Sequence, residues 1–96
     1  YWGTDRYFSG YPVLSAEAAN WIGQLGLKGF GLDAVSVDKV DSRNFTVHKP
    51  LLRHDTIIIE NLANLEKLTD KPFMFSCFPL KIENADGSPV RAVAII

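Results

Sequence analysis

The sequence has few cysteines, no long apolar run and no secretory signal, and these absences exclude several classes of protein. Its 96 residues contain one cysteine, Cys77, so an internal disulfide framework is excluded and a reducing, cytoplasmic location is predicted. Its apolar runs, such as 73–80, are far shorter than the roughly 20 residues that cross a bilayer. Residues 1–6 offer neither the basic start nor the apolar core of a secretory signal. We therefore expect no membrane partner.

The charged residues do not gather into a stripe of one sign. Ten Lys and Arg residues and 11 Asp and Glu residues give a formal net charge of -1. A chain without a basic stripe cannot follow a phosphate backbone, so we expect no nucleic-acid partner. The hydrophobic content of 47% is that of an ordinary globular chain, and the length suits one small domain.

Helix and strand signals alternate along the chain. Ser15 is a good N-cap, and Ala18, Trp21, Ile22 and Leu25 follow at the spacing of one apolar helix face, ending at Gly26. The other predicted elements are a buried strand at 27–32, helical turns at 47–53, a strand at 56–60, a helix at 61–68 and strands at 73–80 and 90–96. This order predicts the α/β class, with a mixed sheet and short helices.

Two further segments have an expected structural role. Residues 1–13 carry Trp2, Tyr7, Phe8 and Tyr11 among glycines, which is typical of an ordered loop against apolar surface and less often of a pocket wall. The polar stretch 33–45 should form turns and caps, because its side chains can accept backbone hydrogen bonds. Cys77 lies in an apolar run without a neighbouring His or cation, so we assign it to the core.

Few residues could carry chemistry. His48 and His54 are six apart, which does not place them on one helix face as a metal-binding pair. Glu60 ends the apolar strand 56–60, where it is either an exposed strand terminus or a buried acid that needs a partner such as a metal ion. Asp33 follows a strand at its carboxyl end, where capping is its commoner role and ligand binding the alternative.

Three ordered segments resemble the second half of the cyclase-family metal-dependent hydrolases, which include bacterial kynurenine formamidase (arylformamidase). The first is Gly-Leu-Asp-Ala-Val-Ser-Val-Asp at 31–38, followed by Asp41 and Ser42. The second runs from Val-His-Lys-Pro-Leu-Leu at 47–52 to Ile-Glu-Asn-Leu at 59–62. The third comprises Pro-Leu-Lys-Ile at 79–82 and Asp-Gly-Ser-Pro-Val-Arg-Ala-Val at 86–93. The resemblance extends along nearly the whole chain.

The resemblance implies a swivelling β/β/α fold and a site for zinc or manganese, often with two ions. It also implies that His48 and Glu60 are metal ligands, while the catalytic and substrate-binding residues stay unassigned. The family's other ligands come from a His-x-Gly-Thr-His-x-Asp segment in the N-terminal half, which this sequence does not contain. The implied activity is hydrolysis of an amide or formamide by metal-activated water, as in the kynurenine pathway of tryptophan catabolism.

These implications lead to a specific expectation. Residues 1–96 would be the C-terminal portion of one cyclase-like hydrolase domain, with the N-terminal half as a missing partner. Two protein ligands fall short of the three usual in a hydrolytic zinc site, so we expect the chain alone to be inactive. Exposed strands should favour a homo-oligomer. The alternative is a non-catalytic interaction module that keeps the fold without a complete site.

Overall fold

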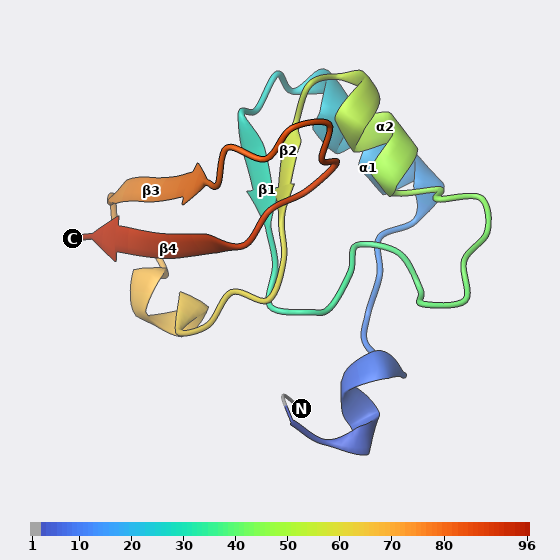
Figure 1. Cartoon of the computed structure of the whole chain (residues 1–96), viewed down its shortest axis with the longest axis horizontal. Coiled ribbons are helices and arrows are strands. Elements are labelled where there is room, and N and C mark those ends of the chain that lie inside the picture. Colours follow the sequence, from blue (N-terminus) through green and yellow to red (C-terminus); the bar gives the residue numbers. More distant parts are fainter. Residues whose placement is uncertain (1–2) are drawn as a thin grey trace. The chain divides into compact units, whose positions relative to one another are not determined.

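The computed structural model describes residues 3–96, which divide into two compact units, 3–63 and 64–96 (Figure 1). The first unit contains the 3-10 helix η1 (Asp5–Phe8), α1 (Ala16–Gln24), β1 (Gly29–Gly31), α2 (His48–Arg53) and β2 (Ile57–Ile59). The second contains the 3-10 helix η2 (Leu65–Leu68), β3 (Met74–Pro79) and β4 (Val90–Ile95). Trp2, which we assigned to the N-terminal loop, lies outside the described residues.

The first unit is built on a two-stranded parallel sheet. Gly29, Phe30 and Gly31 of β1 pair with Ile57, Ile58 and Ile59 of β2. The amide of Leu32 continues the pairing by donating to the carbonyl of Ile59 at 3.0 Å. Parallel strands need a crossover, and here residues 32–56, which include α2, make the connection. Glu60 therefore emerges directly from the end of β2.

Helix α1 begins where the sequence predicts. The Ser15 hydroxyl accepts a hydrogen bond from the amide of Ala18 at 3.1 Å, which caps the helix, and Gly26 takes the left-handed φ of +70° after the helix ends. The predicted apolar face is only partly correct: Ile22 packs against the core, but Leu25 is 49% exposed. Trp21 is 63% exposed, whereas the buried residues of the helix are Ala19 and Gly23.

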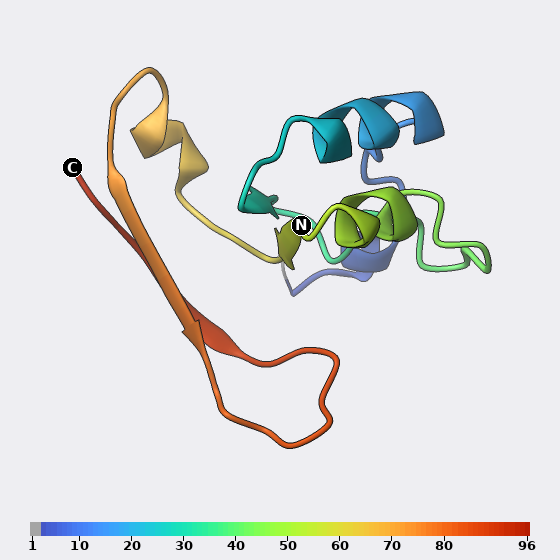
Figure 2. The ribbon, with the colours of Figure 1, turned by 90° about the horizontal axis from the view of Figure 1, so that it is seen from above.

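Small residues on α1 allow the two helices of the first unit to approach closely. A Cβ built on Gly23 would lie 2.9 Å from the carbonyl oxygen of Pro50 in α2, which is too short for a real contact. Helix α1 therefore packs against α2 through Ala19 and Gly23, and α2 in turn packs against β2 (Figures 1 and 2). A larger side chain at position 23 would force the helices apart.

The hydrophobic core of the described chain is small and lies in the first unit. Ala19, Val37, Val47 and Leu51 are buried, with Leu14, Ile22, Phe30, Leu32 and Ile58 packed around them. Burying a Val or Leu side chain contributes about 1.5–3 kcal/mol. The core thus joins the start of α2 to the segment before it, which carries Asp38.

Two sequence predictions need correction in length or burial. The predicted buried strand at 27–32 shortens to β1, where Gly29 and Gly31 are exposed and Phe30 is half-buried, because only β2 pairs with it among the described residues. The predicted helix at 61–68 shortens to η2, because Asn61 and Asn64 adopt left-handed φ values of 59° and 61°. A left-handed residue cannot continue a right-handed helix.

The second unit is an antiparallel ribbon of β3 and β4, which Figure 2 shows edge-on. The pairing of Met74 with Ile95 and of Phe78 with Arg91 sets its register. Cys77 is only partly buried, so its predicted place in the core is wrong. Alternation along the strands puts one apolar set on a single face, and these side chains are 50–82% exposed: Met74, Phe78, Val93 and Ile95.

The predicted class is confirmed: the described chain combines short helices with one parallel and one antiparallel pair of strands. Among residues 3–96, no helix has the length and apolar character needed to cross a membrane.

Candidate metal-binding site

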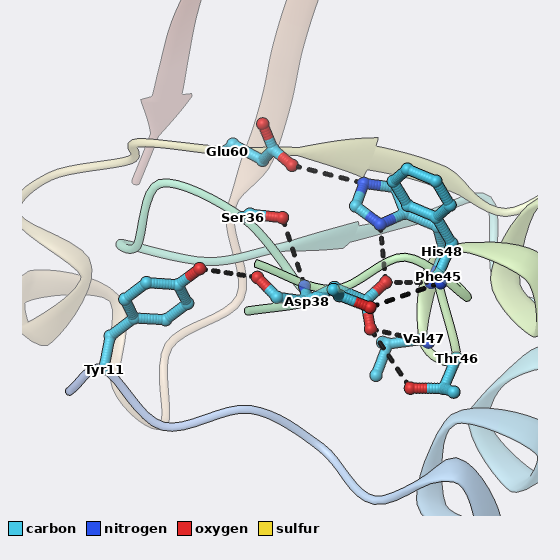
Figure 3. Close-up of polar contacts among 9 residues, drawn as sticks. Tyr11, Ser36, Asp38, Phe45, Thr46, Val47, His48 and Glu60 are labelled. Atoms are coloured by element: carbon cyan, nitrogen blue, oxygen red, sulfur yellow. Dashed lines mark hydrogen bonds and ion pairs between the residues drawn. The ribbon is translucent and has the colours of Figure 1, made fainter. Parts of the chain in front are cut away.

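Asp38 is the polar centre of the first unit. It is 3% exposed, and its Oδ1 accepts hydrogen bonds from the amide of Val47 at 3.0 Å and the hydroxyl of Thr46 at 3.3 Å. Its Oδ2 accepts from the amide of His48 at 2.9 Å (Figure 3). The carboxylate therefore satisfies free amides at the start of α2, a capping role of the kind predicted for the stretch 33–45.

The backbone of Asp38 is held as well as its side chain. The Tyr11 hydroxyl donates to the Asp38 carbonyl at 2.6 Å, and the Asp38 amide donates to the Ser36 hydroxyl oxygen at 3.1 Å. Tyr7, nearer the N-terminus, hydrogen-bonds to the side-chain oxygen of Asn61, the residue after Glu60. The N-terminal aromatic segment thus contacts both stretches that carry the site.

His48 lies between two carboxylates. Its Nδ1 is 2.7 Å from Asp38 Oδ2, and its Nε2 is 3.7 Å from Glu60 Oε1. Figure 3 shows Asp38 and Glu60 at opposite edges of the imidazole ring. The side chains of His48 and Glu60 remain 25% and 32% exposed, so this pair is reachable from solvent.

The two carboxyl groups have opposite pKa shifts. Burial alone would raise the pKa of Asp38, but hydrogen bonds from His48 and Val47 outweigh it and lower the pKa below its ordinary 3.8. Burial raises the pKa of Glu60 above 4.5, and the attraction of His48 only partly offsets this. An ion of positive charge beside Glu60 would stabilise its ionised form.

The facing atoms of His48 and Glu60, an imidazole nitrogen and a carboxylate oxygen, could both bind a divalent cation. Two ligand atoms bound at about 2.1 Å to a tetrahedral zinc ion lie about 3.4 Å apart, close to the observed 3.7 Å. An imidazole nitrogen with a carboxylate is also a donor set typical of zinc. Among residues 3–96, however, no group of three or more His, Cys, Asp or Glu side chains is arranged to hold a metal ion.

The sequence predicts part of this arrangement. It names His48 and Glu60, which the structure brings together from α2 and the end of β2. It leaves open a ligand role for Asp33, which is exposed and forms no hydrogen bond or ion pair with His48 or Glu60. It does not single out Asp38, although this residue belongs to the polar stretch 33–45, which the sequence predicts to form turns and caps.

A separate hollow of about 240 Å³ lies in the first unit, and most of its lining side chains are apolar: Pro12, Val13, Leu14, Phe30, Leu32, Ala34 and Val37. Asp33 is the charged residue at its wall. Tyr7, Phe8 and Tyr11, the aromatic residues of the N-terminal segment that the structure describes, do not line this hollow, so their suggested role as a pocket wall has no support there.

No protein-family model matches the chain. Curated proteins do match. The chain is 39% identical over 97 residues to the uncharacterized protein MJ0783 of Methanocaldococcus jannaschii, covering 100% of this chain and 48% of that protein. It is 37% identical over 82 residues to the kynurenine formamidases of Bacillus cereus and Bacillus anthracis, covering 85% of this chain and 39% of each enzyme.

A solved structure described as a potential metal-dependent hydrolase with cyclase activity matches 86% of this chain and 40% of its own. Its TM-score is 0.67 and its sequence identity 27%. The expected resemblance to cyclase-type hydrolases and kynurenine formamidases is therefore confirmed, in sequence and in fold. The chain spans about half or less of the length of the relatives it matches.

Proposed function

We propose that these 96 residues are the C-terminal portion of a metal-dependent hydrolase similar to kynurenine formamidase, to which they contribute His48 and Glu60 as metal ligands. The observation that carries the proposal is the 3.7 Å approach of Nε2 and Oε1 from two separate elements. The similarity to enzymes named kynurenine formamidase and to a potential metal-dependent hydrolase supports the assignment.

The proposed hydrolytic chemistry follows from the two metal ligands, His48 and Glu60. A bound zinc or manganese ion would lower the pKa of a water ligand and polarise a substrate carbonyl, as hydrolysis of an amide or formamide requires. The role of this chain is to bind and orient: His48 and Glu60 supply a neutral nitrogen and a charged oxygen. The aligned relatives are about twice as long, and we propose that the remaining ligands, including those of a second ion, come from the part without a counterpart here.

The proposed substrate is a small molecule with an amide or formamide bond, such as N-formylkynurenine in tryptophan catabolism. Cytoplasmic location stays a prediction from the single cysteine. We also propose self-association, because the exposed set Met74, Phe78, Val93 and Ile95 forms an apolar face on the ribbon.

The deciding experiment joins this chain to the N-terminal portion of the Bacillus cereus kynurenine formamidase. Bound zinc or manganese would be counted by elemental analysis, and hydrolysis of N-formylkynurenine followed by absorbance. We expect the joined protein to bind metal and hydrolyse the substrate, and the 96-residue chain alone to bind metal weakly and show no activity.

Matched variants test the ligands. His48→Ala and Glu60→Ala should lose metal and activity in the joined protein, whereas His54→Ala and Glu66→Ala, at exposed positions outside the site, should keep both. A folded, metal-loaded protein that hydrolyses no formamide, ester or cyclic amide would overturn the proposal. The second candidate function is a non-catalytic interaction module, which is favoured by the lack of a third ligand among residues 3–96. An inactive but folded and metal-loaded protein would support this second candidate.

A further inference from the structure

We propose that Asp38 is a positioning residue that holds the His48 imidazole in its Nδ1–H tautomer, leaving the Nε2 lone pair directed at Glu60. The inference rests on the proposed metal-binding role of His48 and deepens it, because it assigns a task to a residue that does not itself reach the cation. A neutral imidazole has one protonated and one bare nitrogen, and only the bare one can bind a metal.

The contacts of Asp38 determine which nitrogen carries the proton. Its carboxylate receives the amides of Val47 and His48 and the hydroxyl of Thr46, and the two amides can only donate. An oxygen that already accepts the His48 amide at 2.9 Å then lies 2.7 Å from His48 Nδ1. Two lone pairs would repel at this distance, so Nδ1 must be the protonated nitrogen and the carboxylate its acceptor.

The position of Asp38 is fixed independently of the ring. Tyr11 holds its carbonyl, Ser36 holds its amide, and the start of α2 holds its carboxylate. The ring is further confined by Phe45, whose ring packs edge-on against the imidazole with centroids 5.5 Å apart. A residue held at its backbone and side chain can orient a neighbour. Carboxylates that accept the second ring N–H of a metal-binding histidine fix its tautomer and ring orientation.

The opposite nitrogen then faces an acceptor. With the proton on Nδ1, His48 Nε2 presents a lone pair toward Glu60 Oε1 at 3.7 Å. Two electron-rich atoms at this separation attract a cation placed between them. Asp38 thereby keeps the Nε2 lone pair of His48 available as a metal ligand before any ion binds.

Nitrogen NMR of the metal-free chain tests the inference directly. Long-range ¹H–¹⁵N correlations distinguish the two tautomers at alkaline pH, where imidazole is neutral, and the exposed His54 serves as the internal reference. We expect His48 to be in the Nδ1–H form and His54 in the Nε2–H form that free imidazoles prefer. A His48 ring in the Nε2–H form would overturn the inference whatever the metal affinity.

Zinc titration of variants supplies the second readout. Asp38→Asn should weaken Zn²⁺ binding at His48 roughly tenfold to a hundredfold, because the amide either turns its NH₂ toward Nδ1 or accepts more weakly. Thr46→Val removes one hydrogen bond to Asp38 but leaves the ring contact, so the affinity should stay within twofold. Equal affinity of Asp38→Asn and wild type would overturn the inference.

The two proposals can fail separately. If His48 is in the Nδ1–H form but Zn²⁺ leaves its ring signals unmoved, the positioning role of Asp38 stands and the metal-binding function fails. If Asp38→Asn does not fold, the tautomer of His48 in the wild-type chain still tests the positioning role of Asp38.

Discussion

One oxygen atom of Asp38 contacts His48 twice, at the backbone amide and at the ring Nδ1, at 2.9 Å and 2.7 Å. The first contact caps helix α2 and the second orients the imidazole. The start of the helix and the geometry of the candidate site therefore depend on the same side chain, so a change at Asp38 should alter stability and metal binding together.

Replacing Asp38 should destabilise the chain measurably. Asp38→Ala leaves two helix amides and a hydroxyl without their acceptor, at a cost of about 2–4 kcal/mol in the free energy of unfolding. Urea unfolding followed by circular dichroism would measure it. The control is Asp41→Ala at an exposed position, which should change stability by less than about 0.5 kcal/mol. Equal effects of the two variants would refute the capping role.

Glu60→Gln should alter how stability depends on pH. The raised pKa of Glu60 means that the folded state holds its proton more tightly than the unfolded state, whose pKa is near 4.5. This contribution is present below pH 4.5 and is lost as pH rises through the raised pKa of the folded state. In the metal-free chain, Glu60→Gln should therefore gain stability over wild type as pH rises from 4 to 7.

Thermal unfolding across that pH range gives the measurement for Glu60→Gln. Added Zn²⁺ provides the control, because it should stabilise wild type at pH 7 and leave the variant unchanged. A stability difference that stays constant with pH would contradict the assigned burial of Glu60.

Adjacent leucines in α2 should differ sharply in their effect on stability. Leu51 is fully buried and Leu52 is 54% exposed. Leu51→Ala should cost about 2–5 kcal/mol through lost burial and a cavity, whereas Leu52→Ala should cost less than about 1 kcal/mol. Chemical denaturation measures both, and similar losses would show that the core is not where the structure places it.

Phe78→Ser should weaken self-association. Phe78 is 82% exposed on the apolar face of the ribbon, whereas Phe75 points to the other face and is 39% exposed. Sedimentation velocity over a range of concentrations should show smaller species for Phe78→Ser than for wild type, with Phe75→Ser as the matched control. If the wild-type chain stays monomeric at all concentrations, the proposed self-association is wrong.

Local signals in the sequence predict much of this fold. The Ser15 cap, the strand predicted at 56–60 and the helical turns at 47–53 depend on neighbouring residues. The structure confirms all three, with the strand shortened to Ile57–Ile59. The buried face of α1 could not be predicted from hydrophobicity, because close packing on α2 selects the small residues Ala19 and Gly23.

The residues of the candidate site also differ in how far the sequence predicts them. The family resemblance named His48 and Glu60, but the contact between Asp38 and His48 spans ten residues of irregular chain. No periodic pattern relates residues across such a segment, since its path depends on tertiary hydrogen bonds such as that from Tyr11. The polar stretch 33–45 predicts that one of its side chains caps a helix, but the contact of Asp38 with His48 could be identified only once the chain was folded.

The parallel pairing of β1 with β2 has a kinetic consequence. The two strands meet only after the chain closes a loop over residues 32–56, whereas β3 and β4 belong to a ribbon joined by a shorter connection. Closing the longer loop costs more entropy before any contact repays it. Asp38 and His48 lie inside that loop and Glu60 directly follows β2, so we expect the site to form in the same slow step that pairs the parallel strands.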